Sequence, residues 1–367
     1  MKKYAFFLVL VVFFAVSRLF LFSSLPVYSS SYLVITGFLF LGMIITLGGC
    51  ELFSNGVEGL GGRFNLSHAA TGSLLAAIGT ALPETLIPVI ALLSGKAGQK
   101  EGIAVGAILG APFMLATLAM FFLGLTVLAR GSIKKRKAEL VPNVMAIKFE
   151  SGYIIFAMAV VLAASLAGSR MANALAAFLL LGSYVFFFFR TLKHEAQAHE
   201  KYDEDFHFGL YLGFPARRRW LAFQTAVGLF FMLGGAKLFV EYIQALALKS
   251  GASPLMLSFL IVPFATEFPE KFNSISWTLK GKDTLAMANV TGAMVFQASI
   301  PVSIGLLFTR WALGRAELTA IFMVILMIMM IRITVSLKKE IPFWVLLAGG
   351  GLYLVYLAQA IRPGPVF

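Results

Sequence analysis

Long runs of apolar residues separated by short polar segments dominate the chain. A helix needs about 20 mainly apolar residues to cross the hydrocarbon core of a bilayer, and most of the runs reach that length. They lie at about 32–57, 67–94, 102–129, 151–168, 171–191, 220–248, 254–279, 284–309, 317–336 and 342–361, with one more at 4–25. The pattern predicts an all-α polytopic membrane protein with ten core transmembrane helices.

The first run, at residues 4–25, has two interpretations. Lys2 and Lys3 precede it, as basic residues precede the apolar region of a signal peptide. The run is longer than the usual 7–15 residues of such a region, and no A-x-A cleavage site follows it. We therefore expect residues 1–30 to form a retained N-terminal helix, with a cleaved signal peptide as the alternative.

The composition excludes an ordinary soluble domain and disfavours nucleic acid as a partner. Hydrophobic residues make up 59% of the 367 residues and charged residues only 13%, against roughly 25% charged in soluble domains. The net charge of +13 lies mainly in short loops between apolar runs, a distribution typical of membrane topology. The single cysteine, Cys50, cannot form an internal disulfide.

Basic clusters indicate the orientation of the chain. They fall on one side of the membrane if the N-terminal helix is retained. The clusters are Lys2-Lys3, Arg130 to Lys137, Arg217-Arg218-Arg219, Lys280 with Lys282, and Lys338-Lys339. The positive-inside rule predicts that these loops and the N-terminus lie in the cytoplasm and the C-terminus outside. The plasma (inner) membrane is the expected location.

The two halves of the chain repeat one another. When the sequence is shifted by 186 residues, 14 of the 50 positions from 47 to 96 are identical, including Thr80-x-x-Pro83-Glu84 on Thr266-x-x-Pro269-Glu270. The repeats are predicted at 31–192 and 220–367, joined by a cytoplasmic loop at 193–219. Five spans in each make them inverted, which is typical of secondary transporters. A channel with inverted repeats remains an alternative.

Three glutamates, Glu84, Glu267 and Glu270, interrupt apolar runs at matching places in the two repeats. Each carboxylate near the bilayer centre costs roughly 2.5–3.5 kcal/mol on an insertion scale. Lys271 adjoins Glu270, but successive residues on a helix do not face each other. No Lys or Arg lies at comparable depth beside Glu84. A bound cation is therefore the expected counter-charge, although a protonated glutamate that bonds a neighbouring helix is the alternative.

The surrounding residues predict an all-oxygen site. Pro83 and Pro269 lack a backbone donor, which leaves main-chain carbonyls available beside the glutamates. Thr80 and Thr266 add hydroxyls. Hard cations prefer such ligands, and Ca²⁺ takes about 6–8 oxygens.

Small residues follow in the next helix of each repeat. Gly106-x-x-x-Gly110 and its equivalent Ala288-x-x-x-Gly292 predict close helix packing, and near the site they would also expose carbonyls. Asn289 and Gln297 are the polar candidates on the second of these helices.

Glu51, Glu58 and Lys237 lie in the glycine-rich runs. They either face a water-filled path or lie nearer the membrane interface.

At these positions the sequence resembles the sodium/calcium exchanger family of the calcium/cation antiporter superfamily. The family's first motif is G-T-S-L-P-E-like, and here Gly79 to Glu84 and Ala265 to Glu270 match it. Its second motif is matched more weakly by Gly106 to Pro112 and by Ala288 to Met294. The resemblance implies that Glu84 and Glu270 ligate Ca²⁺ and Na⁺.

The resemblance further implies oxygen ligands from Thr80 and Thr266. The family's serines are replaced by Ala81, Glu267, Ala111 and Ala293, and its later acidic residue by Gln297. The divalent-type site is thus better preserved than the sodium sites, and a proton could replace Na⁺.

The expected function is a secondary cation antiporter that exchanges Ca²⁺ or a related divalent cation for Na⁺ or H⁺ by alternating access. It is not expected to be an enzyme or to hold a cofactor, and its partners are inorganic cations and the lipid bilayer. A cation channel or a non-transporting cation sensor is the alternative. The predicted ligands are Glu84, Glu270, Thr80, Thr266, Glu267, Gln297 and Asn289.

Overall fold

The chain folds into two compact helical units. The computed structural model describes residues 31–63, 77–94, 99–134, 137–195, 206–215 and 217–361, so the predicted helix at 1–30 lies outside the described residues. The first unit comprises residues 1–100 and 188–254, and the second comprises 101–187 and 255–367. Each unit takes elements from both predicted repeats, whose boundaries remain a prediction.

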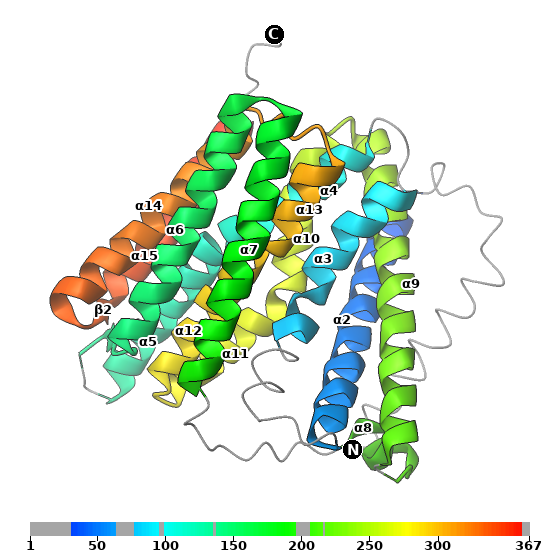
Figure 1. The fold of residues 1–367 in the computed structure, drawn as a ribbon, viewed down its shortest axis with the longest axis horizontal. Helices are drawn as coiled ribbons and strands as arrows, with labels where there is room; N and C mark the ends of the chain where they lie inside the picture. Colours follow the sequence, from blue (N-terminus) through cyan, green and yellow to red (C-terminus); the bar gives the residue numbers. More distant parts are fainter. Residues whose placement is uncertain are drawn as a thin grey trace. The chain divides into compact units, whose positions relative to one another are not determined.

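Two long helices form the centre of the first unit. Helix α2 (Tyr32–Arg63) and helix α9 (Arg218–Ser250) run antiparallel and side by side (Figure 1). At one end the Tyr32 hydroxyl donates to the carbonyl of Lys249, at 2.9 Å, and the rings of Phe38 and Tyr242 stack with centroids 5.0 Å apart. Helix α3 (Ala77–Ser94) packs on both α2 and α9.

Glycines let α2 and α9 approach to backbone contact. Gly42 and Gly49 on α2 are seven residues apart, as are Gly228 and Gly235 on α9. A methyl group on Gly49 would lie 2.6 Å from the backbone nitrogen of Met232, and one on Gly235 would lie 2.6 Å from the carbonyl oxygen of Gly42. Side chains at these positions would force the two backbones apart.

The predicted loop 193–219 contains a short helix, α8 (His207–Leu212), that docks on this pair. The backbone nitrogen of His207 donates to Asn55 Oδ1 at 3.1 Å, and that of Phe208 donates to Gln224 Oε1 at 2.8 Å. Gln224 also donates to Asn55 Oδ1, at 2.9 Å. His207 Nε2 lies 3.1 Å from Glu51 Oε1, so the Glu51 side chain contacts α8.

The second unit contains the remaining helices and one two-stranded sheet. Strand β1 (Glu139–Leu140) pairs antiparallel with β2 (Ile341–Pro342). Helix α7 belongs to this unit as far as Phe187. In chain order the helices are α4 (Lys100–Met114), η3 (Leu115–Ala119), α5 (Met120–Lys134), α6 (Val144–Ala167), α7 (Arg170–Glu195), α10 (Pro254–Thr266), α11 (Phe268–Leu279), α12 (Asp283–Gln297), α13 (Ile300–Phe308), α14 (Arg315–Lys338) and α15 (Phe343–Ile361).

The polytopic all-helical prediction is confirmed. Seven helical segments within the described part of the chain are long and apolar enough to cross a bilayer. They are Tyr32–Phe53, Lys100–Ser132, Val144–Ala167, Arg170–Thr191, Arg218–Ser250, Asp283–Phe308 and Arg315–Lys338. Three shorter apolar helices, Pro83–Leu93, Pro254–Phe264 and Phe343–Gln359, fall where the other predicted spans lie. The count of ten spans remains a prediction.

Close packing through small residues is confirmed for α4. A methyl group on Gly106 would overlap the Leu255 carbonyl oxygen and the Ser258 hydroxyl, and one on Gly110 would overlap the Phe259 carbonyl oxygen, all on α10. Gly292 on α12 differs, because a methyl there would meet none of the described atoms within 4 Å. The second small-residue motif is therefore not confirmed as a packing motif.

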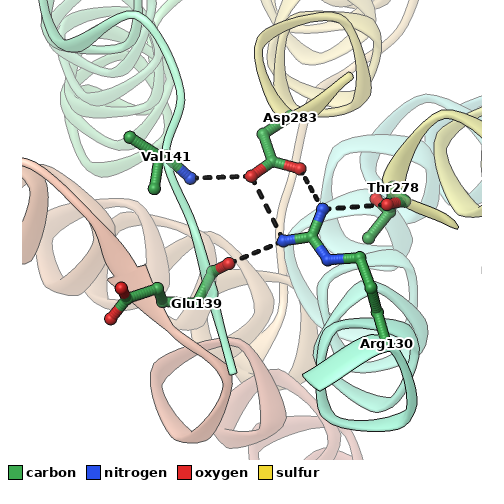
Figure 2. Close-up of polar contacts among 5 residues, drawn as sticks. All are labelled: Arg130, Glu139, Val141, Thr278 and Asp283. Carbon is green, nitrogen blue, oxygen red and sulfur yellow. Dashed lines mark hydrogen bonds and ion pairs between the residues drawn. The ribbon is translucent and has the colours of Figure 1, made fainter. Parts of the chain in front are cut away.

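An arginine ties together the basic end of the second unit (Figure 2). The Arg130 guanidinium, at the end of α5, pairs with Asp283 at the start of α12, and also donates to the carbonyls of Thr278 and Glu139 at 2.9 and 2.7 Å. Asp283 accepts from the backbone nitrogen of Val141 at 2.9 Å. The pairing of β1 with β2 brings the segment after Lys338-Lys339 next to Glu139 and Leu140. Three of the predicted basic loops therefore meet at one end of this unit.

Replacement of Asp283 by asparagine is expected to destabilise the protein. The Arg130 and Asp283 side chains are only 13% and 11% exposed, and removing one partner of a buried pair costs about 3–5 kcal/mol. Thermal unfolding in detergent should show a clearly lower midpoint for D283N. The exposed neighbour Lys282→Gln is the control and should unfold like the wild type. Equal midpoints for all three proteins would show that the pair contributes no stability.

Candidate cation site

Helix α3 positions the candidate residues of the first unit. Glu84 lies in its second turn, is the only charged residue of the helix, and is only 2% exposed. Pro83 and Pro88 lie within the helix, and each lacks the N–H that would reach the carbonyl four residues earlier. These carbonyls belong to Gly79 and to Glu84 itself. The structure thus confirms that a buried carboxylate lies where helical hydrogen bonding is interrupted. The Thr80 side chain is not among those described.

A break between α10 and α11 positions the candidates of the second unit. Glu267 is the turn residue between the two helices, and the side chains of Thr266, Glu267 and Glu270 are 1%, 0% and 3% exposed. The Thr266 hydroxyl donates to the Val262 carbonyl at 3.1 Å, so its oxygen lone pairs remain as acceptors. Pro269 lacks the donor that would reach the Ala265 carbonyl. The predicted interruption of the helix at these acids is confirmed.

Helix α12 brings one of its two candidates to this break. Asn289 Nδ2 donates to the backbone carbonyl of Glu270 and to Ser274 Oγ, both at 2.9 Å. Asn289 therefore lies beside Glu270, with its own side-chain oxygen as a further acceptor.

Gln297 lies eight residues further along α12, about 12 Å along the helix axis. It is the last residue of α12, before the break at Ala298 and Ser299, and is 2% exposed. Its Oε1 atom is buried and accepts no hydrogen bond from the described residues. Gln297 is thus a second buried polar position on the helix.

The ion pair between Lys271 and Glu267 was not foreseen from the sequence. Lys271 Nζ lies 3.3 Å from Glu267 Oε2, and both side chains are buried, at 6% and 0% exposure. Residues four apart lie on one face of a helix, so the spacing contains the signal. Lys271 directly follows Glu270 in the sequence, but its ion-pair partner is Glu267, one helical turn earlier.

A second missed acid is Glu150 on α6. Its carboxylate accepts a short hydrogen bond from the hydroxyl of Thr291 on α12, which is fully buried. The sequence pattern begins the apolar run at residue 151, whereas α6 begins at Val144. Glu150 is therefore part of the helix rather than of the loop before it. The sequence pattern did not indicate this acid because it lies just before the apolar run.

The two groups of residues offer the same chemistry. Each supplies a buried carboxylate next to a proline-interrupted helix, and the second adds a hydroxyl and an amide oxygen. These are the hard oxygen donors that alkali and alkaline-earth cations prefer. The two groups belong to different units, and the ligand set remains a prediction.

Comparison with known proteins identifies the family. The family model described as "Sodium/calcium exchanger protein" matches residues 34–193 and 220–362. An uncharacterised membrane protein of Methanocaldococcus jannaschii is 24% identical over 328 residues, which cover 88% of this chain and 97% of that protein. A protein of Alkalimonas amylolytica named as an antiporter, CaxA, is 24% identical over 295 residues, which cover 77% of this chain and 84% of that protein.

Solved structures show the same fold. The H⁺/Ca²⁺ exchanger CAX superposes with a TM-score of 0.74 at 17% identity, over 99% of this chain and 89% of CAX. The sodium–calcium exchanger NCX_Mj, soaked with Na⁺ and Sr²⁺, superposes with a TM-score of 0.53 at 21% identity, over 89% of this chain and 99% of NCX_Mj. The chain therefore belongs to the sodium/calcium exchanger protein family and is a multi-pass membrane cation antiporter, not an enzyme.

Proposed function

We propose that the protein exchanges Ca²⁺, or a related divalent cation, for H⁺ or Na⁺ by alternating access, and that Glu84 and Glu270 ligate the transported cation. The observation that supports the proposal most directly is the burial of these two acids, 2% and 3% exposed, at equivalent positions of the repeated sequence. A charge so deep in a transporter needs a counter-charge, and a cargo cation supplies it.

The remaining ligands come from the residues around these acids. Thr266 has acceptor lone pairs after donating its proton to Val262, and Asn289 is held beside Glu270 by two hydrogen bonds. Thr80 is the equivalent of Thr266 in the first repeat. Gln297 provides a neutral oxygen where the family resemblance predicts an acid. Oxygen ligands of this kind suit a divalent ion that sheds its water.

The names of similar proteins favour Ca²⁺ and leave two counter-ions to be distinguished. One structural neighbour is an H⁺/Ca²⁺ exchanger and another is a sodium–calcium exchanger. In this chain alanine or glutamate occupies the positions at which the family has sodium-binding serines, as at Ala81 and Glu267. The loss of these hydroxyls favours H⁺ over Na⁺.

The proposed orientation follows from the basic loops. Three of the five basic clusters meet at one end of the second unit, as one-sided loops should. The positive-inside rule assigns this end to the cytoplasm. We therefore place the C-terminus outside and the protein in the plasma (inner) membrane. Tagging the C-terminus with a reporter that matures only on one side of the membrane checks this assignment.

Reconstituted vesicles test the proposed exchange. Ca²⁺ uptake should depend on an outward gradient of either H⁺ or Na⁺, and it should stop when that gradient is removed. Mn²⁺ and Mg²⁺ serve as competing divalent ions, and K⁺ serves as a control gradient. Equal Ca²⁺ flux without any counter-ion gradient would indicate a channel, and binding without flux would indicate a sensor. Either outcome would overturn the proposal.

A further inference from the structure

The second unit contains a buried lysine beside its candidate acids. The Lys271 side chain is 6% exposed, and its ammonium has three kinds of electron-rich neighbour. Nζ lies 3.3 Å from the Glu267 carboxylate, 3.4 Å from the Pro263 carbonyl oxygen and 5.5 Å from the centre of the Phe264 ring. A fully buried lysine is rare unless it is paired, so these contacts explain how the charge is tolerated.

A small monovalent cation would also be attracted by these neighbours. Carboxylate and carbonyl oxygens bind hard cations, and an aromatic face attracts any cation within about 6 Å. The ammonium is attached to the chain through its own helix, four residues after Glu267. The place beside Glu267 is therefore occupied by a cation that cannot leave.

The charge of the helix break follows from this arrangement. Glu267 and Glu270 provide two negative charges within four residues, and Lys271 provides one positive charge. The i,i+4 spacing puts Lys271 and Glu267 on one helix face, where their side chains pair, whereas Glu270 is only the sequence neighbour of Lys271. Glu267 is thus paired with a positive charge of the protein itself, whereas Glu270 ligates cargo in the proposed function.

We infer that Lys271 is a tethered cation that takes the place of one mobile monovalent ion at Glu267, and so sets the ion stoichiometry and selectivity of the exchanger. This inference rests on the proposed function. Glu267 then balances the charge of Lys271 and does not ligate the transported cation. The transport cycle moves one monovalent cation fewer than it would with a free carboxylate at that position.

Substitution of Lys271 by methionine tests the inference because methionine preserves the length and removes the charge. The buried Glu267 carboxylate then loses its paired ammonium, and a cation from solution can take that place. The thermal unfolding midpoint of K271M in detergent should rise with added Na⁺ or K⁺, relative to choline, by more than that of the wild type. The number of monovalent cations exchanged per Ca²⁺ in vesicles should also increase by about one.

Two further variants separate this role from a purely structural one. In E267Q/K271M both charges are absent, and the additional dependence on Na⁺ or K⁺ should disappear. Lys280→Met removes an exposed lysine after α11 and should show the wild-type ion dependence. Equal ion dependence of K271M and the wild type would overturn the inference.

A reciprocal variant keeps the test decisive if K271M does not accumulate. E267Q leaves the Lys271 ammonium without its carboxylate, and its repulsion should weaken Ca²⁺ binding about tenfold or more. E267Q/K271M should recover that affinity. Wild-type Ca²⁺ affinity in E267Q would contradict the inference. The binding and unfolding measurements do not require transport, so a wild type that binds ions but does not exchange them would refute the proposed function alone.

Discussion

Glutamine at position 84 or position 270 is expected to reduce counter-ion-driven ⁴⁵Ca²⁺ uptake by about 100-fold or more. Each substitution keeps the shape of the side chain and removes a buried negative charge. Loss of one partner from a buried charge pair costs about 3–5 kcal/mol, and each 1.4 kcal/mol is tenfold in affinity. Initial rates of uptake into proteoliposomes, with protein content matched, measure the effect.

The control for this prediction is another glutamate outside the predicted site. Glu340 follows α14, next to strand β2, and E340Q should transport like the wild type. Both site variants should remain folded, because glutamine removes the need for a counter-charge in an apolar environment. Wild-type uptake in E84Q and E270Q would remove these residues from the cation site.

Leucine in place of Gly49 or Gly235 is expected to disrupt the α2–α9 pair. Even a methyl at either position would lie 2.6 Å from backbone atoms of the other helix, so a leucine can be accommodated only if the helices separate. Overpacking costs typically 1–3 kcal/mol and occasionally more, and here the rigid backbone gives little relief. Both variants should unfold at lower temperature and lose transport.

The adjacent glycines provide matched controls. A methyl on Gly48 or on Gly234 would meet none of the described atoms within 4 Å. Leucine at these positions also gains helix propensity, by up to about 1 kcal/mol relative to glycine. G48L and G234L should therefore fold at least as well as the wild type. If all four variants behaved alike, close approach of the two helices would not explain the glycine pattern.

The apolar runs predicted most of the fold because each membrane-spanning helix must satisfy its backbone internally. The run at 317–336 became α14, and the run at 254–279 became α10 and α11 with the expected interruption at Glu267. The repeated Thr-x-x-Pro-Glu motif located two acids that the structure confirms to be buried. That these two acids ligate a cation remains a prediction.

Features that depend on distant contacts were missed for physical reasons. Helix α8 has only six residues and is held by Asn55 and Gln224 from two long helices, so no local period identifies it. Helix α9 packs on α2 in the same unit, although more than 150 residues of sequence separate the two helices. The Lys271–Glu267 pair is different, because its four-residue spacing is a local pattern that the sequence itself contains.

The heptad spacing of the glycines restricts how α2 and α9 can move. Gly42 and Gly49 form notches seven residues apart, and Gly228 and Gly235 form matching notches on α9. Seven residues span about 10.5 Å along a helix. A smaller slip would drive side chains of one helix into the other's backbone. We therefore expect α2 and α9 to move together, as a pair, during the transport cycle.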